Sequence, residues 1–527
     1  MDHILHERVP VMEEILKITR QPGLSVGVIH EGHEVFKCNL GTKDTQQDQP
    51  PDSDTLYCIA SLSKAFMSAS LDILVQERKI SWNDTIASIL PEFHHMKQPS
   101  ILSHMTIQDI CSHRTGLESL DEITQGMDGR ILIPKANLIQ VCNALPIKHD
   151  LRTRYLYNNA MYALAGHVVE QASEYSNWGD FQRTTAFRSV HETDTNIATP
   201  YMILTDGSPS KIAPTELSAN SMNGGSGGIR SSVNDLLKWC KCPLGAFDAG
   251  LDNSSPIRFE SPMFDRLTIA NPRFEKDGDY CAGWCYHQTP GKLGLISPNR
   301  ALISSVIGRS SASLLVYGHQ GDVPGYTCNI YIIPETKSAI VVLSNGTGLS
   351  DATETCAVCV CHILRFTTDW IAQDLLQTMH SLQPSVDFVN VANKAKLKYL
   401  NQYLEHYTAP LEKHRVPSTE SPHLDDFAGS YTMEGLDIVC IDITKKSGDA
   451  SRLQMTINKQ TDQTLDLWHY HFDVFCHLPR TFDECLIRGF WRDTWDSTLI
   501  AFKRNNEYEV TSLCWVLNGV EVLFSKA

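Results

Sequence analysis

The chain has 527 residues, a formal net charge of −16 at pH 7 and a hydrophobic content of 42%. This length predicts two or three domains, and the hydrophobic fraction is sufficient for an ordinary globular core. The negative charge argues against nucleic acid and anionic membrane surfaces as partners, and no apolar run is long enough to span a membrane.

The N-terminus and the cysteines predict a reducing compartment. Residues 1–17 (MDHILHERVPVMEEILK) are charged and amphipathic, and they lack the apolar core of a secretory signal. The 16 cysteines show no repeating spacing, in a chain much too long for a disulfide scaffold. We therefore expect reduced thiols and a cytoplasmic protein.

The first predicted elements are a helix and a hairpin. Residues 3–20 have the apolar periodicity of an amphipathic helix. Residues 23–41 carry two apolar runs around the turn His30-Glu31-Gly32-His33, which is typical of a β-hairpin. A polar, proline-rich loop follows at residues 44–54.

The stretch from Thr55 to Glu77 begins with a short apolar run and continues as a predicted helix. Its apolar stripe has the helical period: Leu62, Phe66, Ala69 and Ile73. Ser61 stands at the helix start, where serine is a favoured N-cap, and Lys64 follows on the same face of the first turn. The helix dipole disfavours a cation there, which suggests a desolvated lysine that takes the serine's proton during attack. This is the S-x-x-K motif of serine acyl-transfer enzymes.

The S-x-x-K motif is weak when it stands alone. Ser208-Pro-Ser-Lys211 fits the same pattern, although its proline and the surrounding loop argue against a helix interior. The simpler interpretation of Ser61 is a helix cap beside a solvated Lys64.

The middle of the chain is predicted to be rich in short helices. Residues 105–116 form one of them, capped at Gly116. Residues 120–150 lack clear periodicity, and one interpretation is that they form a loop region that covers the site. Tyr157 and Asn159 lie at the turn that opens the next helix.

Strands follow a second helical region. A glycine-rich turn at residues 223–228 leads into a helix after Ser232. Four segments then read as successive strands: YCAGWCYH, SASLLVYGHQG, YTCNIYIIPE and SAIVVLSNG. Because strands flank a helix-rich middle, the sequence predicts an α+β fold, with one antiparallel sheet built from both ends of the domain, helices packed on it and a helical subdomain.

The C-terminal part changes character. Residues 366–411 have a helical pattern, and a polar segment with two prolines reads as a linker. Short apolar stretches alternate with turn residues over 424–527, which predicts a small all-β barrel of lipocalin-like type or a sandwich. The predicted divisions are a first domain at 1–365, a helical connector and linker at 366–423, and the β domain at 424–527.

One cysteine cluster has partial metal-site spacing. It consists of Cys356, Cys359, Cys361 and His362. The cluster lies in a stretch that reads as a buried helix, and no second Cys or His pair stands at finger-like spacing. We expect no metal and no other cofactor.

Taken together, residues 1–365 resemble the β-lactamase-related serine hydrolases, which include class C β-lactamases, D-peptidases similar to penicillin-binding proteins, and related esterases and transesterases. The segments that carry the resemblance follow the family's order: PGLSVGVIHEG, YCIASLSKAF, MTIQDICSHRTGL, YLYNNAMYALAGHVVE, GGSGGIRSSVNDLLKW and GHQGDVPGYTCNIYIIPE. FAGSYTMEG, further on, resembles the opening of the small β domain that follows many such hydrolases. The resemblance implies a β-lactamase/transpeptidase-like domain.

Context decides between competing matches to the family's motifs. Tyr175 and Tyr399 also begin Y-x-N patterns, and His30 begins a second H-x-G. Tyr175 falls at the end of its helix, and His30 lies in a hairpin turn ahead of the nucleophile. The resemblance therefore assigns the motifs to Tyr157 and His319, with the simpler alternatives of a packing aromatic and a strand histidine.

The resemblance implies a role for each matched residue. Ser61 is the nucleophile, Lys64 and Tyr157 share the general-base work, and Asn159 orients Lys64 or the substrate. The oxyanion hole is expected from the backbone N–H of Ser61 and one from the region of Gly321 and Asp322.

Two positions depart from the family's pattern. His319 stands where lactamases and peptidases often carry lysine, so it offers less fixed charge to a substrate carboxylate. We expect it to line the site and to titrate near ~6.5. Asp322 follows Gly321, where a carboxylate would oppose a developing oxyanion unless it points away.

These assignments predict an acyl-enzyme hydrolase or acyltransferase for a small-molecule ester, thioester or lactone, free or carrier-bound. The acidic, cysteine-rich chain and its long C-terminal extension resemble fungal enzymes that act on polyketide-type secondary metabolites. The alternatives are a non-catalytic binding or scaffold module and a D-peptidase or β-lactamase. The oligomeric state and the acyl acceptor, water or an alcohol, stay open.

Overall fold

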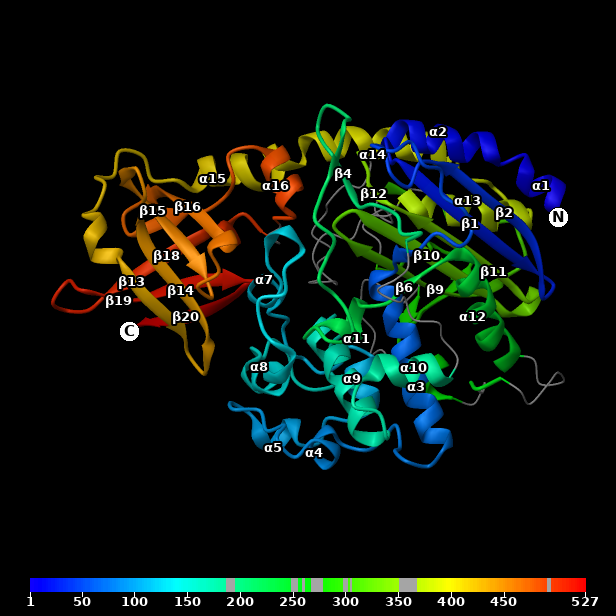
Figure 1. Cartoon of the computed structure of the whole chain (residues 1–527), viewed down its shortest axis with the longest axis horizontal. Helices are drawn as coiled ribbons and strands as arrows, with labels where there is room; N and C mark the ends of the chain where they lie inside the picture. Colours follow the sequence, from blue (N-terminus) through cyan, green and yellow to red (C-terminus); the bar gives the residue numbers. More distant parts are fainter. Residues whose placement is uncertain are drawn as a thin grey trace.

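The computed structural model describes residues 1–185, 195–247, 255–257, 261–266, 278–296, 302–303, 306–349, 367–490 and 494–527. Its N-terminal part is built on a seven-stranded sheet in the order β2-β1-β11-β10-β9-β8-β7, antiparallel throughout (Figure 1). The strands are β1 (Gly23–His30), β2 (His33–Gly41), β7 (Asp279–Tyr280), β8 (Cys285–Thr289), β9 (Leu314–Val323), β10 (Tyr326–Ile333) and β11 (Ser338–Ser344). Because β1 pairs with β11, both ends of the domain build one sheet, as predicted.

The sheet is covered by helices on both faces. Side chains of β10 alternate: Tyr331 and Ile333 join one core, and Ile330 and Ile332 join the other. The first core is closed by α1 (Asp2–His6), α2 (Val9–Thr19), α13 (Thr367–Met379) and α14 (Phe388–Tyr403). The second is closed by α3 (Ser63–Gln76) and α12 (Val233–Ala246), and α3 is buried over most of its length.

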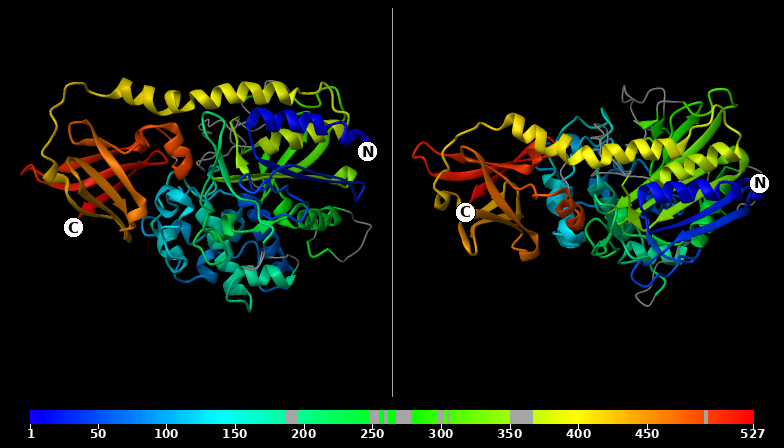
Figure 2. Two further views of the ribbon diagram at one scale, coloured as in Figure 1. Left: turned by 45° about the horizontal axis from the view of Figure 1, so that its top comes forward. Right: turned by 90° about the horizontal axis from the view of Figure 1, so that it is seen from above.

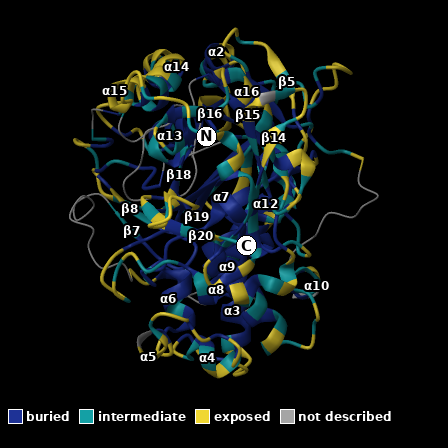
Figure 3. Cartoon of the chain, turned by 90° about the vertical axis from the view of Figure 1, so that its left-hand side faces the viewer, coloured by how far each residue is buried: buried dark blue, intermediate teal, exposed yellow. Residues whose placement is uncertain are grey.

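A helical subdomain packs around α3 at the other side of the sheet (Figure 1). Its helices are α4 (Ile86–Ile89), α5 (Pro99–Leu102), α6 (Ile107–Cys111), α7 (Asp121–Thr124), α8 (Leu138–Ala144), α9 (Asn159–Ala172), α10 (Trp178–Thr185) and α11 (Gly224–Gly227). Two small sheets are formed by short strands: β12 (Gly346–Thr347), β4 (Tyr201–Ile203) and β5 (Pro209–Lys211) in one, and β3 (Tyr57–Cys58) and β6 (Arg230–Ser231) in the other. Figure 3 shows α4 and α5 at the exposed edge and α3 and α9 nearer the buried centre.

The C-terminal part forms a closed eight-stranded barrel. Its strands are β13 (Gly429–Met433), β14 (Leu436–Lys446), β15 (Asp449–Ile457), β16 (Thr464–His471), β17 (Val474–Cys476), β18 (Leu499–Arg504), β19 (Val510–Leu517) and β20 (Val520–Lys526). Pairing of β13 with β20 closes it, and α16 (Phe482–Arg488) lies between β17 and β18. Figure 2 shows α14 and α15 (Ala409–His414) running as one rod from the sheet to the barrel. The predicted α+β domain followed by an all-β domain is therefore confirmed.

Three local predictions are wrong. Residues 3–20 form two helices rather than one, and Pro10, which has no N–H to bond to a preceding turn, stands in the first turn of α2. Ser61 is not an N-cap: it lies inside the one-turn helix η1 (Ala60–Leu62), and α3 begins after it at Ser63. The short helix α6 ends at Cys111, so Gly116 does not cap it.

Two sequence predictions concern features that the structure leaves open. The cluster from Cys356 to His362 lies outside the described residues. The divisions at 365 and 423 stay predictions. Among the helices that the structure describes, none combines the length and the apolar character needed to cross a bilayer.

Candidate active site

Ser61 lies at a turn that packs against the sheet. Ala60, just before it, has a φ of 46°, in the left-handed region that non-glycine residues rarely enter. Gly321 on β9 reaches the same turn, because a Cβ at this position would lie 2.2 Å from the carbonyl oxygen of Ile59. The strained turn and the adjacent strand together fix the position of the Ser61 hydroxyl.

The Ser61 hydroxyl is contacted by both residues that the sequence paired with it. Lys64 Nζ donates to Ser61 Oγ at 3.0 Å, and the Tyr157 hydroxyl donates to the same oxygen at 2.8 Å. Lys64 is fully buried, and its Nζ lies 4.7 Å from the centre of the Tyr157 ring. The predicted trio of serine, lysine and tyrosine is thus in direct hydrogen-bonded contact.

Two further groups hold the Lys64 side chain. Its Nζ donates to Asn159 Oδ1 at 2.8 Å and to the Ser226 carbonyl oxygen at 2.9 Å. Asn159 opens α9, as predicted, and Ser226 belongs to the glycine-rich turn α11. Gly225 allows that turn to approach α9, since a Cβ there would lie 2.4 Å from the Tyr162 carbonyl oxygen. The Ser226 contact uses a backbone atom, so no sequence signal pointed to it.

An imidazole packs against the Tyr157 ring. The His113 ring lies 4.2 Å from the Tyr157 ring, and its Nδ1 accepts the backbone N–H of Asn158 at 3.1 Å. Burial and the nearby Lys64 lower the pKa of His113 well below its usual value, so the ring packs as a neutral group. This packing sets the direction in which the phenol points.

His319 is placed differently from the prediction. It is fully buried, and the residues that line the pocket around Ser61 do not include it. Its Nδ1 lies 2.5 Å from the Gln320 carbonyl oxygen, which can only accept, so Nε2 accepts from the Tyr280 hydroxyl at 3.0 Å. Burial, with a further contribution from Lys64, lowers the pKa of His319 to about 3 rather than leaving it near ~6.5. Its imidazole contacts protein groups beneath the site.

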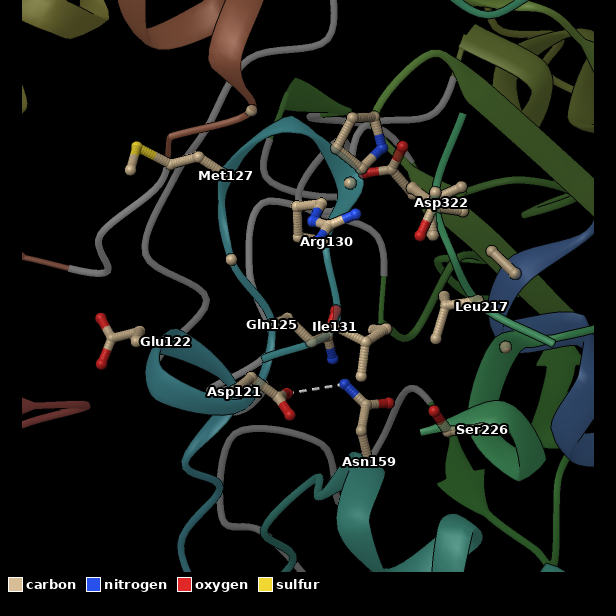
Figure 4. Close-up of a pocket in the computed structure, with 18 of the residues that line it drawn as sticks. Asp121, Glu122, Gln125, Met127, Arg130, Ile131, Asn159, Leu217, Ser226 and Asp322 are labelled. Carbon is tan, nitrogen blue, oxygen red and sulfur yellow. Dashed lines mark hydrogen bonds between the residues drawn. The ribbon is translucent and has the colours of Figure 1, made fainter. Parts of the chain in front are cut away.

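Gly321 and Asp322, which follow His319 in the predicted third motif, have different surroundings. Asp322 lines the pocket, whereas Gly321 lies against the turn of Ser61. Figure 4 shows Asp322 at the end of the pocket opposite Asn159. The Asp322 carboxylate is therefore a pocket group, and its neighbour provides room for the nucleophile turn.

A cavity of about 130 Å³ opens in front of Ser61. One wall is the segment Asp121–Ile131, which lies in the region considered as a cover over the site. Asp121 stands at the start of this segment, and its Oδ2 accepts a hydrogen bond of 2.7 Å from Asn159 Nδ2 (Figure 4). The outer wall includes Ile457, Gln463 and Gly489 of the barrel, which sequence reasoning did not connect to the site.

The competing motif matches have structural contacts of their own. Ser208 precedes the exposed strand β5, and its hydroxyl donates to Asp206. The Tyr399 hydroxyl donates to the Ile203 carbonyl oxygen, and His30 bonds to Ser338. None of these side chains belongs to the described lining of the pocket.

Within the residues that the structure describes, no group of three or more His, Cys, Asp or Glu side chains is arranged to hold a metal ion. The side-chain groups in contact with the Ser61 hydroxyl are the Lys64 amine and the Tyr157 phenol.

Comparison with known proteins agrees with this geometry. A sequence model of the family described as Beta-lactamase matches residues 10–357. The chain belongs to the Beta-lactamase family. Its matched segment contains Ser61, Lys64, Tyr157 and Asn159.

Several curated relatives share this region. The Unguisins hydrolase ungD of Aspergillus violaceofuscus is 24% identical over 379 residues, covering 66% of this chain and 62% of the relative. The Unguisins hydrolase ungD' of Aspergillus campestris is 24% identical over 370 residues, covering 66% of this chain and 63% of the relative. Protein flp of Staphylococcus aureus is 23% identical over 346 residues, covering 64% of this chain and 62% of that protein. The matches thus span less than two thirds of each relative.

Solved structures share the fold. The octameric penicillin-binding protein homologue from Pyrococcus abyssi superposes with a TM-score of 0.55 at 18% identity, covering 99% of this chain and 100% of that chain. The β-lactamase/D-alanine carboxypeptidase from Pseudomonas syringae has a TM-score of 0.51 at 16% identity, covering 65% of this chain and 94% of that chain.

The pocket includes residues that lie outside the segment matched by the family. The match ends at residue 357, ahead of α13 and the barrel. Ile457, Gln463 and Gly489 therefore reach the Beta-lactamase pocket from a part of the chain that the family match leaves out.

Proposed function

We propose that this chain is a serine hydrolase that acts through an acyl-enzyme on Ser61. The observation that carries the proposal is the pair of contacts to Ser61 Oγ, 3.0 Å from Lys64 Nζ and 2.8 Å from the Tyr157 hydroxyl, at a pocket wall. A nucleophile within hydrogen-bond reach of a base that is itself oriented by a third group has the geometry of covalent catalysis. Membership of the Beta-lactamase family supports the same chemistry.

The reaction proceeds in two steps. Ser61 Oγ attacks the acyl carbonyl, and the hydroxyl proton passes to the deprotonated base of the pair, either the free amine of Lys64 or the phenolate of Tyr157, as the O–C bond forms. The tetrahedral intermediate collapses, the bond to the leaving group breaks, and the leaving group takes up that proton. Water then attacks the ester on Ser61 by the same route in reverse, which releases the acid and restores the hydroxyl.

The developing oxyanion needs hydrogen-bond donors. We assign this role to the backbone N–H of Ser61 and to one from the Gly321–Asp322 region, which the close packing of Gly321 on the nucleophile turn supports. Asn159 holds Lys64 through its Oδ1.

The charges at the pocket favour a neutral acyl substrate. Among the described lining residues, Arg130 is the one guanidinium or ammonium group outside the nucleophile pair, and it is shared by Glu216 and Asp462. Asp121 and Asp322 also line the wall, so a substrate carboxylate would meet acidic groups. This argues for an ester, thioester or lactone, with a polyketide-type metabolite as the natural candidate, over a β-lactam or peptide carboxylate.

Water is the favoured acyl acceptor. Two of the curated relatives are named hydrolases, which supports hydrolysis here. Transfer to an alcohol is the second candidate, and product masses from a thioester incubated with and without alcohols distinguish the two.

A fluorophosphonate probe tests the proposal directly. Wild type should gain the mass of one phosphonyl adduct in intact-protein mass spectrometry, and Ser61→Ala should gain none. Ser208→Ala is the matched control, because it removes the serine of the competing motif from an exposed loop, and it should label as wild type does. No labelling of folded wild type would instead favour the non-catalytic binding module, and labelling of Ser61→Ala would identify another nucleophile.

A further inference from the structure

The segment Asp121–Leu132 lies between the pocket and the C-terminal barrel. On its inner side, Met127 and Ile131 line the cavity in front of Ser61. On its outer side, the segment is hydrogen-bonded to the barrel loop that joins β15 to β16, residues 458–463. Figure 4 shows the segment arching over the pocket between Asn159 and the end of α16 near Met127.

We propose that Gln463 and the barrel loop around it are specificity-determining parts of the active site, because they hold the segment Asp121–Leu132 where it limits the size of the acyl group. The inference rests on the acyl-enzyme function proposed above. It goes beyond that function by assigning the barrel a part in substrate selection.

Gln463 makes the central contact. Its side chain is fully buried, its Oε1 accepts the backbone N–H of Met127 at 2.8 Å, and its Nε2 donates to the Met127 carbonyl oxygen at 3.2 Å. This side-chain amide is the partner of the Met127 N–H, and it shares the Met127 carbonyl oxygen with the backbone N–H of Arg130, which lies 3.2 Å from that oxygen. Gly126 makes room for it, since a Cβ there would lie 2.3 Å from Gln463 Oε1.

Further bonds tie the same segment to the barrel at residues that follow Met127. Asn458 Nδ2 and Gln460 Nε2 donate to the Leu132 carbonyl oxygen at 3.3 and 3.4 Å. Arg488 of α16 donates to Asp128 Oδ2 at 3.1 Å. Arg130 approaches Asp462 to 3.2 Å, but this pair is well exposed and contributes little. The buried Gln463 contact is therefore the one on which the position of the segment depends most.

Because the cavity is small, the position of the segment Asp121–Leu132 affects which acyl groups fit in it. Ligand pockets usually measure about 300–1,000 Å³, whereas this cavity measures about 130 Å³. Ile457 and Gln463 contribute directly to its lining, next to Met127 and Ile131. A small displacement of the segment would change the fraction of acyl groups that fit in front of Ser61.

The test compares two glutamines of the barrel in the full chain. Gln463→Ala removes both bonds to Met127. Gln454→Ala is the matched control, because Gln454 lies on β15, ahead of the same loop, and its side chain donates to Asp466 within the barrel. Each variant is treated with ethyl and decyl fluorophosphonates, and the ratio of the decyl to the ethyl labelling rate is compared with wild type. We expect Gln463→Ala to raise this ratio at least tenfold and Gln454→Ala to leave it unchanged.

Amide hydrogen exchange gives a second readout that needs no catalysis. Exchange across residues 121–132 should be at least tenfold faster in Gln463→Ala than in wild type or Gln454→Ala. An unchanged labelling ratio, or unchanged exchange, in a folded Gln463→Ala chain would overturn the inference. If wild type does not label at all, the acyl-enzyme function fails, and the exchange result alone decides whether the barrel holds this wall. If Gln463→Ala does not fold, Gln463→Glu, which keeps the length and the acceptor but loses the donor, is judged by the same criteria.

Discussion

Asp121 Oδ2 accepts a hydrogen bond of 2.7 Å from Asn159 Nδ2, and this contact determines which end of the Asn159 amide faces Lys64. With its nitrogen committed to the carboxylate, Asn159 presents Oδ1 to Lys64 Nζ at 2.8 Å. Asp121 is therefore a positioning residue that acts on the nucleophile pair through Asn159.

Removing the Asp121 carboxylate should slow acylation. A lost charge-assisted hydrogen bond costs about 1.5–3 kcal/mol, so Asp121→Ala should lower kcat/KM by roughly 10–100-fold, mainly through kcat. Asp121→Asn keeps one oxygen that can accept from Asn159 and should recover most of the rate. Steady-state kinetics on an activated ester check this, and an Asp121→Ala effect confined to KM would contradict the positioning role.

Lys64 and Tyr157 should behave as one unit. Both contact Ser61 Oγ, so Lys64→Ala and Tyr157→Phe should each slow acylation by about 10²–10⁴-fold. The double variant should be slower than the worse single variant by less than tenfold, because groups that share one proton transfer are non-additive. Single-turnover rates measure this, and losses that multiply would show that the two side chains act independently.

The sequence predicted best what depends on local spacing. Ser61 and Lys64 stand one helical turn apart, so their contact followed from the motif itself. Tyr157 and Asn159 came from the ordered resemblance, because nothing local links them to Ser61. The N-cap interpretation of Ser61 failed because Ala60 adopts a left-handed conformation and inserts a separate turn before α3.

What depends on distant packing could not be predicted. Gln463 bonds to Met127 although the two are 336 residues apart in the sequence, and neither residue belongs to a motif that predicts the contact. The strand pattern predicted that His319 lies on a strand, but it did not predict that the Tyr280 hydroxyl of β7 would bond to the His319 ring. The sequence predicted an all-β barrel for the C-terminal part. It did not predict that the barrel lies at the pocket, because that position depends on how α14 and α15 connect the barrel to the sheet (Figure 2).

Gly321 should be intolerant of even one added carbon. Gly321→Ala would place a Cβ 2.2 Å from the Ile59 carbonyl oxygen and 2.6 Å from Cys328 Sγ, so the strand or the nucleophile turn must shift. We expect a loss of about 1–3 kcal/mol in the free energy of unfolding and a marked loss of acylation rate. Gly245→Ala in α12 is the control, because Ser255, at 3.7 Å, is the one side chain of the described residues that its Cβ would meet. Equal denaturant midpoints for the two variants would contradict the close packing.

Chelators should leave activity unchanged. The proposed chemistry uses Ser61, Lys64 and Tyr157 and needs no metal. Esterase activity after dialysis against EDTA or phenanthroline measures this. A loss that zinc restores would direct attention to Cys356, Cys359, Cys361 and His362, which the sequence analysis assigned to a buried helix.

His319 should affect stability in acid more than the rate near neutrality. Burial lowers its pKa to about 3, while an unfolded histidine titrates near ~6.5. Between these values the unfolded chain binds more protons, so the stabilising contribution of neutral His319 is complete above pH ~6.5 and is lost progressively as the pH falls toward 3. The free energy of unfolding should therefore fall by about 1.4 kcal/mol per pH unit in this window on account of His319.

His319→Gln should remove that share of the acid sensitivity, since glutamine does not titrate. Denaturant unfolding at pH 4.5, 5.5 and 6.5 should show a slope shallower than wild type by about 1.4 kcal/mol per pH unit. His33→Gln, at an exposed histidine that begins β2, is the control and should keep the wild-type slope. Because His319 stays neutral from pH 5 to 8, the profiles of kcat/KM against pH for wild type and His319→Gln should have the same shape there. An inflection near pH 6.5 that His319→Gln abolishes would mean that the imidazole titrates in contact with the reacting groups, and the buried position described for it would be wrong.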